Sequence, residues 1–259
     1  MEGTICFSYS HSLTMMIKHC FLSFLIKFLW IYGGGSRPVQ ESLRPLRVEF
    51  QSFNLQNILQ WHPGSAFTPN NTVYFVQYKI YGEKQWNIKE ECWGIHELFC
   101  DLTNEMSDVQ EPYYGRVKAV SAGIHTNWSK TERFNPWWET KIGPPSINVI
   151  QSNKSMQLTL YAPSSPYKSK KGRNISIQNY YELVYRVFVA NNSQDKKQKV
   201  YEGTNHKVEM DMISGSNNCL VAEIYLPELD RSSESTEICI FMTQRNDTED
   251  GPLRKANST

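Results

Sequence analysis

The sequence predicts an all-β protein built from two tandem β-sandwich domains joined by a rigid elbow. Three observations lead to this fold class. Short segments alternate apolar and polar residues, the second half of the chain repeats the pattern of the first, and an aromatic segment closing on Pro-Pro separates the halves. No segment has convincing helical periodicity.

The bulk properties agree with two packed domains. The chain has 259 residues, enough for two domains of roughly 100 residues each plus the ends. Hydrophobic residues make up 40% and aromatic residues 13%, which is typical of packed domains. Lys and Arg number 27 against 26 Asp and Glu, and the net charge of +1 gives no global field that would attract nucleic acid.

The two ends of the chain are expected to lie outside the domains. Residues 1–36 are predicted to be a signal peptide with extra N-terminal sequence, because a short basic region precedes an apolar run, 20–31, that is too short to span a bilayer. An uncleaved anchor is the alternative. The polar tail, 244–259, is expected to be disordered. We therefore expect a secreted monomer with no membrane insertion.

The first domain is predicted to span residues 41–140. Its alternating segments predict strands at 47–53, 57–61, 73–81, 113–120 and 127–134. The apolar face of the third of these strands carries Tyr74, Val76, Tyr78 and Ile80. Trp128, next to the fourth strand, is expected to stack on Arg116.

The second domain is predicted to span residues 141–243 and to repeat this plan. Its strands are expected at 147–150, 156–161, 181–189 and 219–225, followed by one that contains Cys239. Residues 164–179 are expected to form a long polar loop. Between the domains, 134–145 holds Trp137 and Trp138 ahead of Pro-Pro, so we expect an extended segment that packs and fixes an angle.

The cysteines and glycosylation sequons favour the secretory route. Four cysteines fall two to each domain, which predicts the bridges Cys92–Cys100 and Cys219–Cys239, with Cys6 and Cys20 in the leader. Cys92, His96 and Cys100 could instead bind a metal, but zinc needs a fourth ligand and none is near in sequence. Glycosylation is expected at the sequons of Asn70, Asn127, Asn153, Asn174, Asn191 and Asn246, and Asn257 begins a further one.

Catalytic chemistry has no support in the sequence. Phosphate-loop, Gly-x-Ser-x-Gly and His-Glu-x-x-His patterns are missing, so no catalytic residue, metal or cofactor is expected. Two local basic runs have two readings: solvated loop charge, or a contact for heparan chains or an acidic partner. The first run is Lys168, Lys170, Lys171 and Arg173, and the second is Lys196, Lys197 and Lys199.

These features together resemble the class II cytokine receptors, which have two fibronectin type III-like domains. The likeness covers about residues 41–240. It rests on the Trp-rich elbow, on one cysteine pair in each domain and on five segments: QYKIYG (77–82), EPYYGRV (111–117), PWWETKI (136–142), YYELVYRVF (180–188) and VAEIY (221–225). The resemblance implies a secreted decoy that binds interleukin-22 in its elbow and keeps this cytokine from the membrane receptor.

The resemblance also implies where the cytokine binds. In such receptors the ligand touches loops of both domains near the bend, among them the long loop after Ala162. Carried onto this chain, the contact residues are Tyr81, Gly82, Glu83, Asn104, Glu105, Met106, Ser107, Asp108, Leu226, Pro227 and Glu228. The alternative function is a secreted adhesion or glycosaminoglycan-binding module of the same fold, because a fold does not determine a function.

Overall fold

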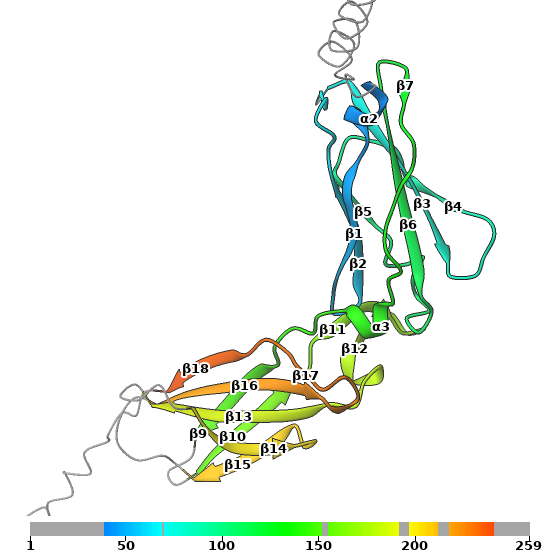
Figure 1. Cartoon of the computed structure of the whole chain (residues 1–259). Helices are drawn as coiled ribbons and strands as arrows, with labels where there is room; N and C mark the ends of the chain where they lie inside the picture. Colours follow the sequence, from blue (N-terminus) through cyan, green and yellow to red (C-terminus); the bar gives the residue numbers. More distant parts are fainter. Residues whose placement is uncertain (1–38, 69, 152–154, 192–196, 212–217, 241–259) are drawn as a thin grey trace, which may run out of the picture.

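A computed structural model describes residues 39–68, 70–151, 155–191, 197–211 and 218–240. It confirms the all-β class and the two sandwich domains, which meet at a sharp bend (Figure 1). We call residues 39–140 the first domain and 141–240 the second domain. The predicted signal peptide and tail, with Cys6 and Cys20, lie outside the described residues.

The first domain consists of two facing antiparallel sheets. One has the order β1(Leu46–Phe53), β2(Gln56–His62), β5(Phe99–Asp101). The other has the order β4(Asn87–Ile95), β3(Thr72–Ile80), β6(Tyr113–Ser121), β7(Ile124–His125), and β8(Ser129–Lys130) also pairs with β6. The long pair at its centre runs in register from Thr72 opposite Ser121 to Ile80 opposite Tyr113. The helix α2(Val39–Leu43) precedes β1.

The core of the first domain follows from the alternation. Tyr74 and Val76 of β3 are buried, as predicted, and Tyr78 and Ile80 pack against the same cluster. Trp61 from the opposite sheet packs on Tyr74, with ring centroids 5.3 Å apart. Each fully buried apolar side chain contributes roughly 1.5–3 kcal/mol, so alternation on facing strands is enough to hold the sheets together.

The second domain repeats this architecture. One sheet has the order β15(Lys207–Asp211), β10(Ser155–Tyr161), β9(Ser146–Gln151). The other has the order β14(Lys197–Gly203), β13(Val184–Asn191), β16(Asn218–Leu226), β17(Arg231–Ser232), and β18(Thr236–Ile240) also pairs with β16. Leu183, Tyr185 and Val187, which alternate along the predicted strand 181–189, are buried. The β13–β16 pair is thus the counterpart of the β3–β6 pair.

Both predicted disulfides are present. Cys92–Cys100 joins β4 to β5 and so links the two sheets of the first domain, while Cys219–Cys239 joins directly opposed residues of β16 and β18. The Cys92–Cys100 bridge removes both thiols from the alternative metal site. His96 Nδ1 instead lies 2.8 Å from the carbonyl oxygen of Thr72.

Several segments differ from the prediction. The strands β4, β14 and β15 were not predicted, and of the expected strand 127–134 only Ser129–Lys130 is β-strand. Residues 164–179 are not a plain loop: β11(Ser164–Lys168) and β12(Asn174–Ser176) form a hairpin, and the 3-10 turn η1(Ile177–Asn179) follows. The elbow is not extended throughout, because Pro136–Glu139 form the short helix α3. Asn135 caps this helix by accepting the N–H of Trp138 (3.0 Å), and Pro136 suits its first turn.

Candidate functional site

The elbow is a packed joint in which Trp137 of α3 belongs to both domains. Its indole stacks on the Tyr181 ring, with centroids 5.3 Å apart and 18° between the planes. The indole N–H donates to the carbonyl of Tyr180 (3.0 Å), and the Tyr181 hydroxyl donates back to the carbonyl of Trp137 (2.8 Å). Burial raises the pKa of Tyr181, so this hydroxyl keeps its proton at physiological pH.

The turn between β1 and β2 inserts into the second domain. Leu55 is fully buried and packs in the same cluster as Leu158 and Ile224 of the second domain. Asn54 and Leu55 both have positive φ, +50° and +69°, which is unfavourable for leucine. The burial of Leu55 and the bond from its N–H to Thr140 Oγ1 (2.9 Å) offset this strain. The turn between β1 and β2 is therefore packed into the core of the second domain.

Two side chains of the second domain donate hydrogen bonds to backbone carbonyls of the first domain. Tyr167 of β11 donates its hydroxyl to the carbonyls of Thr103 (3.1 Å) and Met106 (3.2 Å). Arg231 of β17 donates to the carbonyls of Trp138 (3.1 Å) and Thr140 (3.0 Å). These bonds hold the loops of both domains in fixed positions around α3.

Replacing Tyr167 with phenylalanine should lower the free energy of unfolding by about 1 kcal/mol. The ring and its packing remain, and only the hydroxyl that serves Thr103 and Met106 is lost. Urea unfolding of this variant measures the change. Tyr161→Phe, at an exposed tyrosine, is the matched control and should leave the free energy of unfolding unchanged. Equal effects of the two substitutions would show that the Tyr167 hydroxyl adds nothing to the joint.

Tyr81 projects from the β3–β4 loop at the elbow end of the first domain, and 53% of it is exposed. Its N–H donates to the carbonyl of Pro112 (2.7 Å), and its ring lies near the Tyr114 ring (6.1 Å) and the Arg133 guanidinium (5.4 Å). Gly82 has φ +90°, a conformation in which other residues are strained. Glu83 closes the loop by accepting the N–H of Ile80 (3.2 Å). Tyr81 is therefore exposed on an ordered loop.

Two inward-pointing side chains, Glu105 and Met106, anchor the loop 104–108 to the first domain. Glu105 points inward to Lys89 of β4, with 2.6 Å between the carboxylate and the ammonium group. Burial lowers the pKa of Lys89, but its hydrogen bonds to Glu105 and Glu91 outweigh this and raise the pKa overall. Met106 is fully buried in the core of the first domain. The exposed residues of the loop are Asn104, Ser107 and Asp108.

The third predicted loop begins at the end of β16 and contains the 3-10 turn η2(Pro227–Leu229). Leu226 is buried in the core of the second domain, whereas Pro227 and Glu228 are exposed. Asp230 ends the turn in the left-handed conformation (φ +46°) and accepts the hydroxyl of Tyr225 (2.7 Å).

The predicted contact residues thus lie on loops at the elbow ends of the two domains. We call eight exposed ones the elbow surface: Tyr81, Gly82, Glu83, Asn104, Ser107, Asp108, Pro227 and Glu228. Met106 and Leu226 are left out as a correction, because their side chains fill cores, and Glu105 because it is paired with Lys89. The elbow surface combines one exposed aromatic side chain, Tyr81, with polar and acidic residues.

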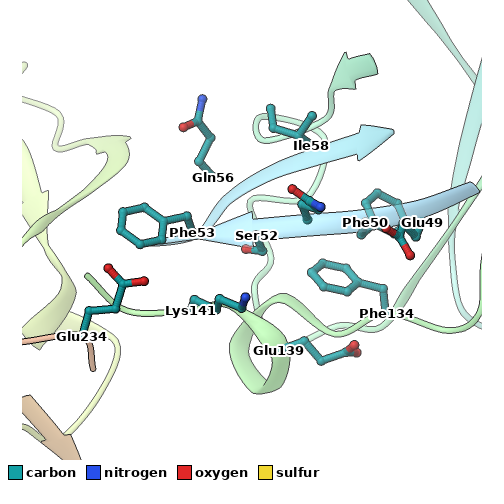
Figure 2. A pocket seen from close by; sticks show the side chains of 11 residues that line it. Glu49, Phe50, Ser52, Phe53, Gln56, Ile58, Phe134, Glu139, Lys141 and Glu234 are labelled. Atoms are coloured by element: carbon teal, nitrogen blue, oxygen red, sulfur yellow. The ribbon is translucent and has the colours of Figure 1, made fainter. Parts of the chain in front are cut away.

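An open pocket of about 630 Å³ lies on the inner side of the bend. Figure 2 shows Phe50, Phe53 and Phe134 lining it, with Lys141 and Glu234 at the side of the second domain. Sequence reasoning missed this pocket because its lining residues come from the two domains and are far apart in sequence. The β3–β4 loop that carries Tyr81 lies on the opposite side of the first domain (Figure 1).

Comparison with known families assigns each half of the chain. Residues 21–128 match the family described as tissue factor, and residues 140–243 match the family described as the fibronectin type III domain of the interferon-alpha/beta receptor. The structure is similar to that of the chicken interferon gamma receptor alpha chain, with a TM-score of 0.59 at 21% identity. That similarity covers 77% of this chain and 98% of the other, and it concerns the fold alone.

Curated relatives are much closer in sequence. The chain is 51% identical to human interleukin-22 receptor subunit alpha-2, over 86% of this chain and 97% of the relative. It is 49% identical to the mouse protein of the same name, over 88% of this chain and 100% of the relative. Human interleukin-20 receptor subunit alpha is more distant, 33% identical over 75% of this chain and 35% of the relative.

Proposed function

Since the chain belongs to the interleukin-22 receptor subunit alpha-2 family of the class II cytokine receptors, we propose that it is a secreted protein that binds interleukin-22 at the elbow surface. We further propose that it acts as a decoy antagonist, which keeps the cytokine from the membrane receptor. It would then work by binding alone, with no chemical step.

The observation that carries this proposal is the exposed Tyr81 on an ordered loop beside a rigid joint. Tyrosine offers a large contact area and a polar tip and loses little entropy on ordering, so it is a frequent hot spot of protein interfaces. The fixed joint adds to this, because loops that are already in place lose less conformational entropy when a ligand binds.

Secretion is supported by the two disulfides and by the accessibility of the sequons. Disulfides of this kind persist in oxidising compartments. Asn70, Asn127 and Asn174 are exposed and could carry glycans, while Asn153 and Asn246 lie outside the described residues, as does the side chain of Asn191. Among the residues that the structure describes, no helix is long and apolar enough to cross a membrane.

Expression from the native leader in cultured cells should deliver the protein to the medium in glycosylated form. The expected result is a band in the medium that shifts to lower mass after enzymatic removal of N-glycans. Retention in the membrane pellet after carbonate extraction would contradict secretion and support the uncleaved anchor.

The decoy role is tested by adding the purified chain to cells that respond to interleukin-22 through their membrane receptor. We expect the response to fall in proportion to the cytokine bound, and to return when more interleukin-22 is added. A parallel titration measures binding itself. Binding without any loss of the cellular response would overturn the decoy role while leaving the receptor assignment intact.

A further inference from the structure

The tip of the β11–β12 hairpin carries a dense set of exposed positive charges. Lys168, Lys170, Lys171 and Arg173 are all exposed, and the sequence from 162 to 181 contains no Asp or Glu. Among the described residues none of the four takes part in an ion pair. We propose that this hairpin tip binds sulfated glycosaminoglycan chains, independently of whether the elbow surface binds a cytokine.

The hairpin fixes the arrangement of these charges. Its strands pair from Ser164 opposite Ser176 to Lys168 opposite Asn174. At the tip, the N–H of Ser169 donates to the carbonyl of Arg173, and the N–H of Gly172 donates to the carbonyl of Ser169, both at 2.8 Å. Gly172 has φ +73°, which lets the chain turn back within a few residues. Short runs of Lys and Arg held together in this way match the density of negative charge on heparin-like polymers.

The second basic run differs from the hairpin tip because acidic side chains lie next to its charges. Lys199 of β14 pairs with Glu202, and Arg186 of the neighbouring strand pairs with the same carboxylate and lies 3.7 Å from Glu223. Hydrogen bonds from Lys199 and Arg186 lower the pKa of Glu202, so this carboxylate stays ionised and offsets part of the charge of the run. The run in β14 is therefore a poor site for a polyanion.

Two cations of the first domain, Arg116 and Lys118, are also engaged. Arg116 lies between the rings of Trp86 (4.1 Å) and Trp128 (4.4 Å), which confirms the predicted stack on Trp128. Lys118 lies over the Trp128 ring at 5.1 Å. Arg116 and Lys118 are only partly exposed, because the aromatic side chains cover them. Compared with these two groups of described residues, the hairpin tip presents its basic side chains to solvent without paired acids or covering rings.

The hairpin is anchored to the elbow close to its basic tip. Tyr167, next to Lys168, donates its hydroxyl to the carbonyls of Thr103 and Met106 in the first domain. Figure 1 places β11 and β12 beside α3 at the joint. A glycosaminoglycan on the tip would then lie near the elbow surface, and it would hold the secreted protein at cell surfaces or in the extracellular matrix.

The test uses the full secreted chain after enzymatic removal of N-glycans, because Asn174, opposite Lys168, begins a sequon, and a size-defined heparin oligosaccharide at 150 mM salt. The variant Lys168→Gln/Lys170→Gln/Lys171→Gln should bind the oligosaccharide at least ~10-fold more weakly, because each lost contact no longer releases a counterion. The matched control Lys197→Gln/Lys199→Gln/Lys207→Gln removes the same net charge at exposed positions of β14 and β15 and should change affinity less than about twofold. The hairpin variant should also lower the salt dependence of binding.

Three results would overturn the proposal: no heparin binding by the parent chain, equal losses in the two variants, or equally tight binding of single-stranded DNA of the same charge. The last would show a general polyanion surface rather than a glycosaminoglycan site. Thermal unfolding of both variants checks the fold. Should the hairpin variant unfold early, Arg173→Gln alone serves as the second test and should still weaken binding.

Discussion

Tyr81→Ala should weaken interleukin-22 binding by at least ~2 kcal/mol, which is about 30-fold in the dissociation constant. The tyrosine is half-exposed, and its ring projects from a loop that the bond to Pro112 and the conformation of Gly82 hold in place. Removal of the ring deletes contact area without moving the loop. Titration of both proteins with interleukin-22 measures the change.

Phe99→Ala is the matched control for this prediction. Phe99 of β5 is as exposed as Tyr81, 54% against 53%. It pairs with Gln60 of β2, in the sheet that does not contain β3 and its Tyr81 loop. It should leave the dissociation constant unchanged, and both variants should unfold within a degree or two of the parent chain. Unchanged affinity in Tyr81→Ala, or a loss that follows lowered stability, would remove Tyr81 from the site.

Trp137→Ala should lower the free energy of unfolding by about 3–5 kcal/mol, the usual cost of removing a large packed aromatic side chain. The indole fills the joint against Tyr181, and its N–H satisfies the carbonyl of Tyr180. Alanine would leave a cavity where Trp137 packs against the core of the second domain, the same core that buries Leu55. Urea unfolding followed by circular dichroism measures the loss.

The neighbouring tryptophan supplies the control. Trp138 is 57% exposed and contacts Trp137 edge-on at 5.1 Å, while its carbonyl, which Arg231 binds, remains in any variant. Trp138→Ala should therefore cost less than about 1 kcal/mol. Similar losses in the two variants would mean that the elbow is not held by Trp137.

Much of the fold could be predicted because burial in a sandwich leaves a period of two in the sequence. The alternation in β3, β6 and β13 reads directly as Tyr74, Val117 and Val187 facing their cores. The β4 strand was missed, because apart from Lys89 and Cys92 its residues are mostly exposed and give no such pattern. Alternation therefore reveals strands with a buried face and misses those at the edge.

The candidate site could be located only in part. Tyr81 and Gly82 fall in a recognisable segment, but the sequence cannot show that Glu105 turns inward to Lys89 or that Met106 is buried. The contacts of Tyr167 and Arg231 join residues more than 60 positions apart, so no local pattern predicts them. The hairpin at 164–176 has short, polar strands, and such a sequence predicts a loop.

Hydrogen–deuterium exchange with and without interleukin-22 tests the central claim most directly, because it reports where the ligand covers the chain. The account predicts slower exchange at 81–83, 104–108 and 227–230, on loops of both domains at the elbow. Protection confined to the inner pocket between Phe53 and Lys141, or no protection at saturating ligand, would contradict it.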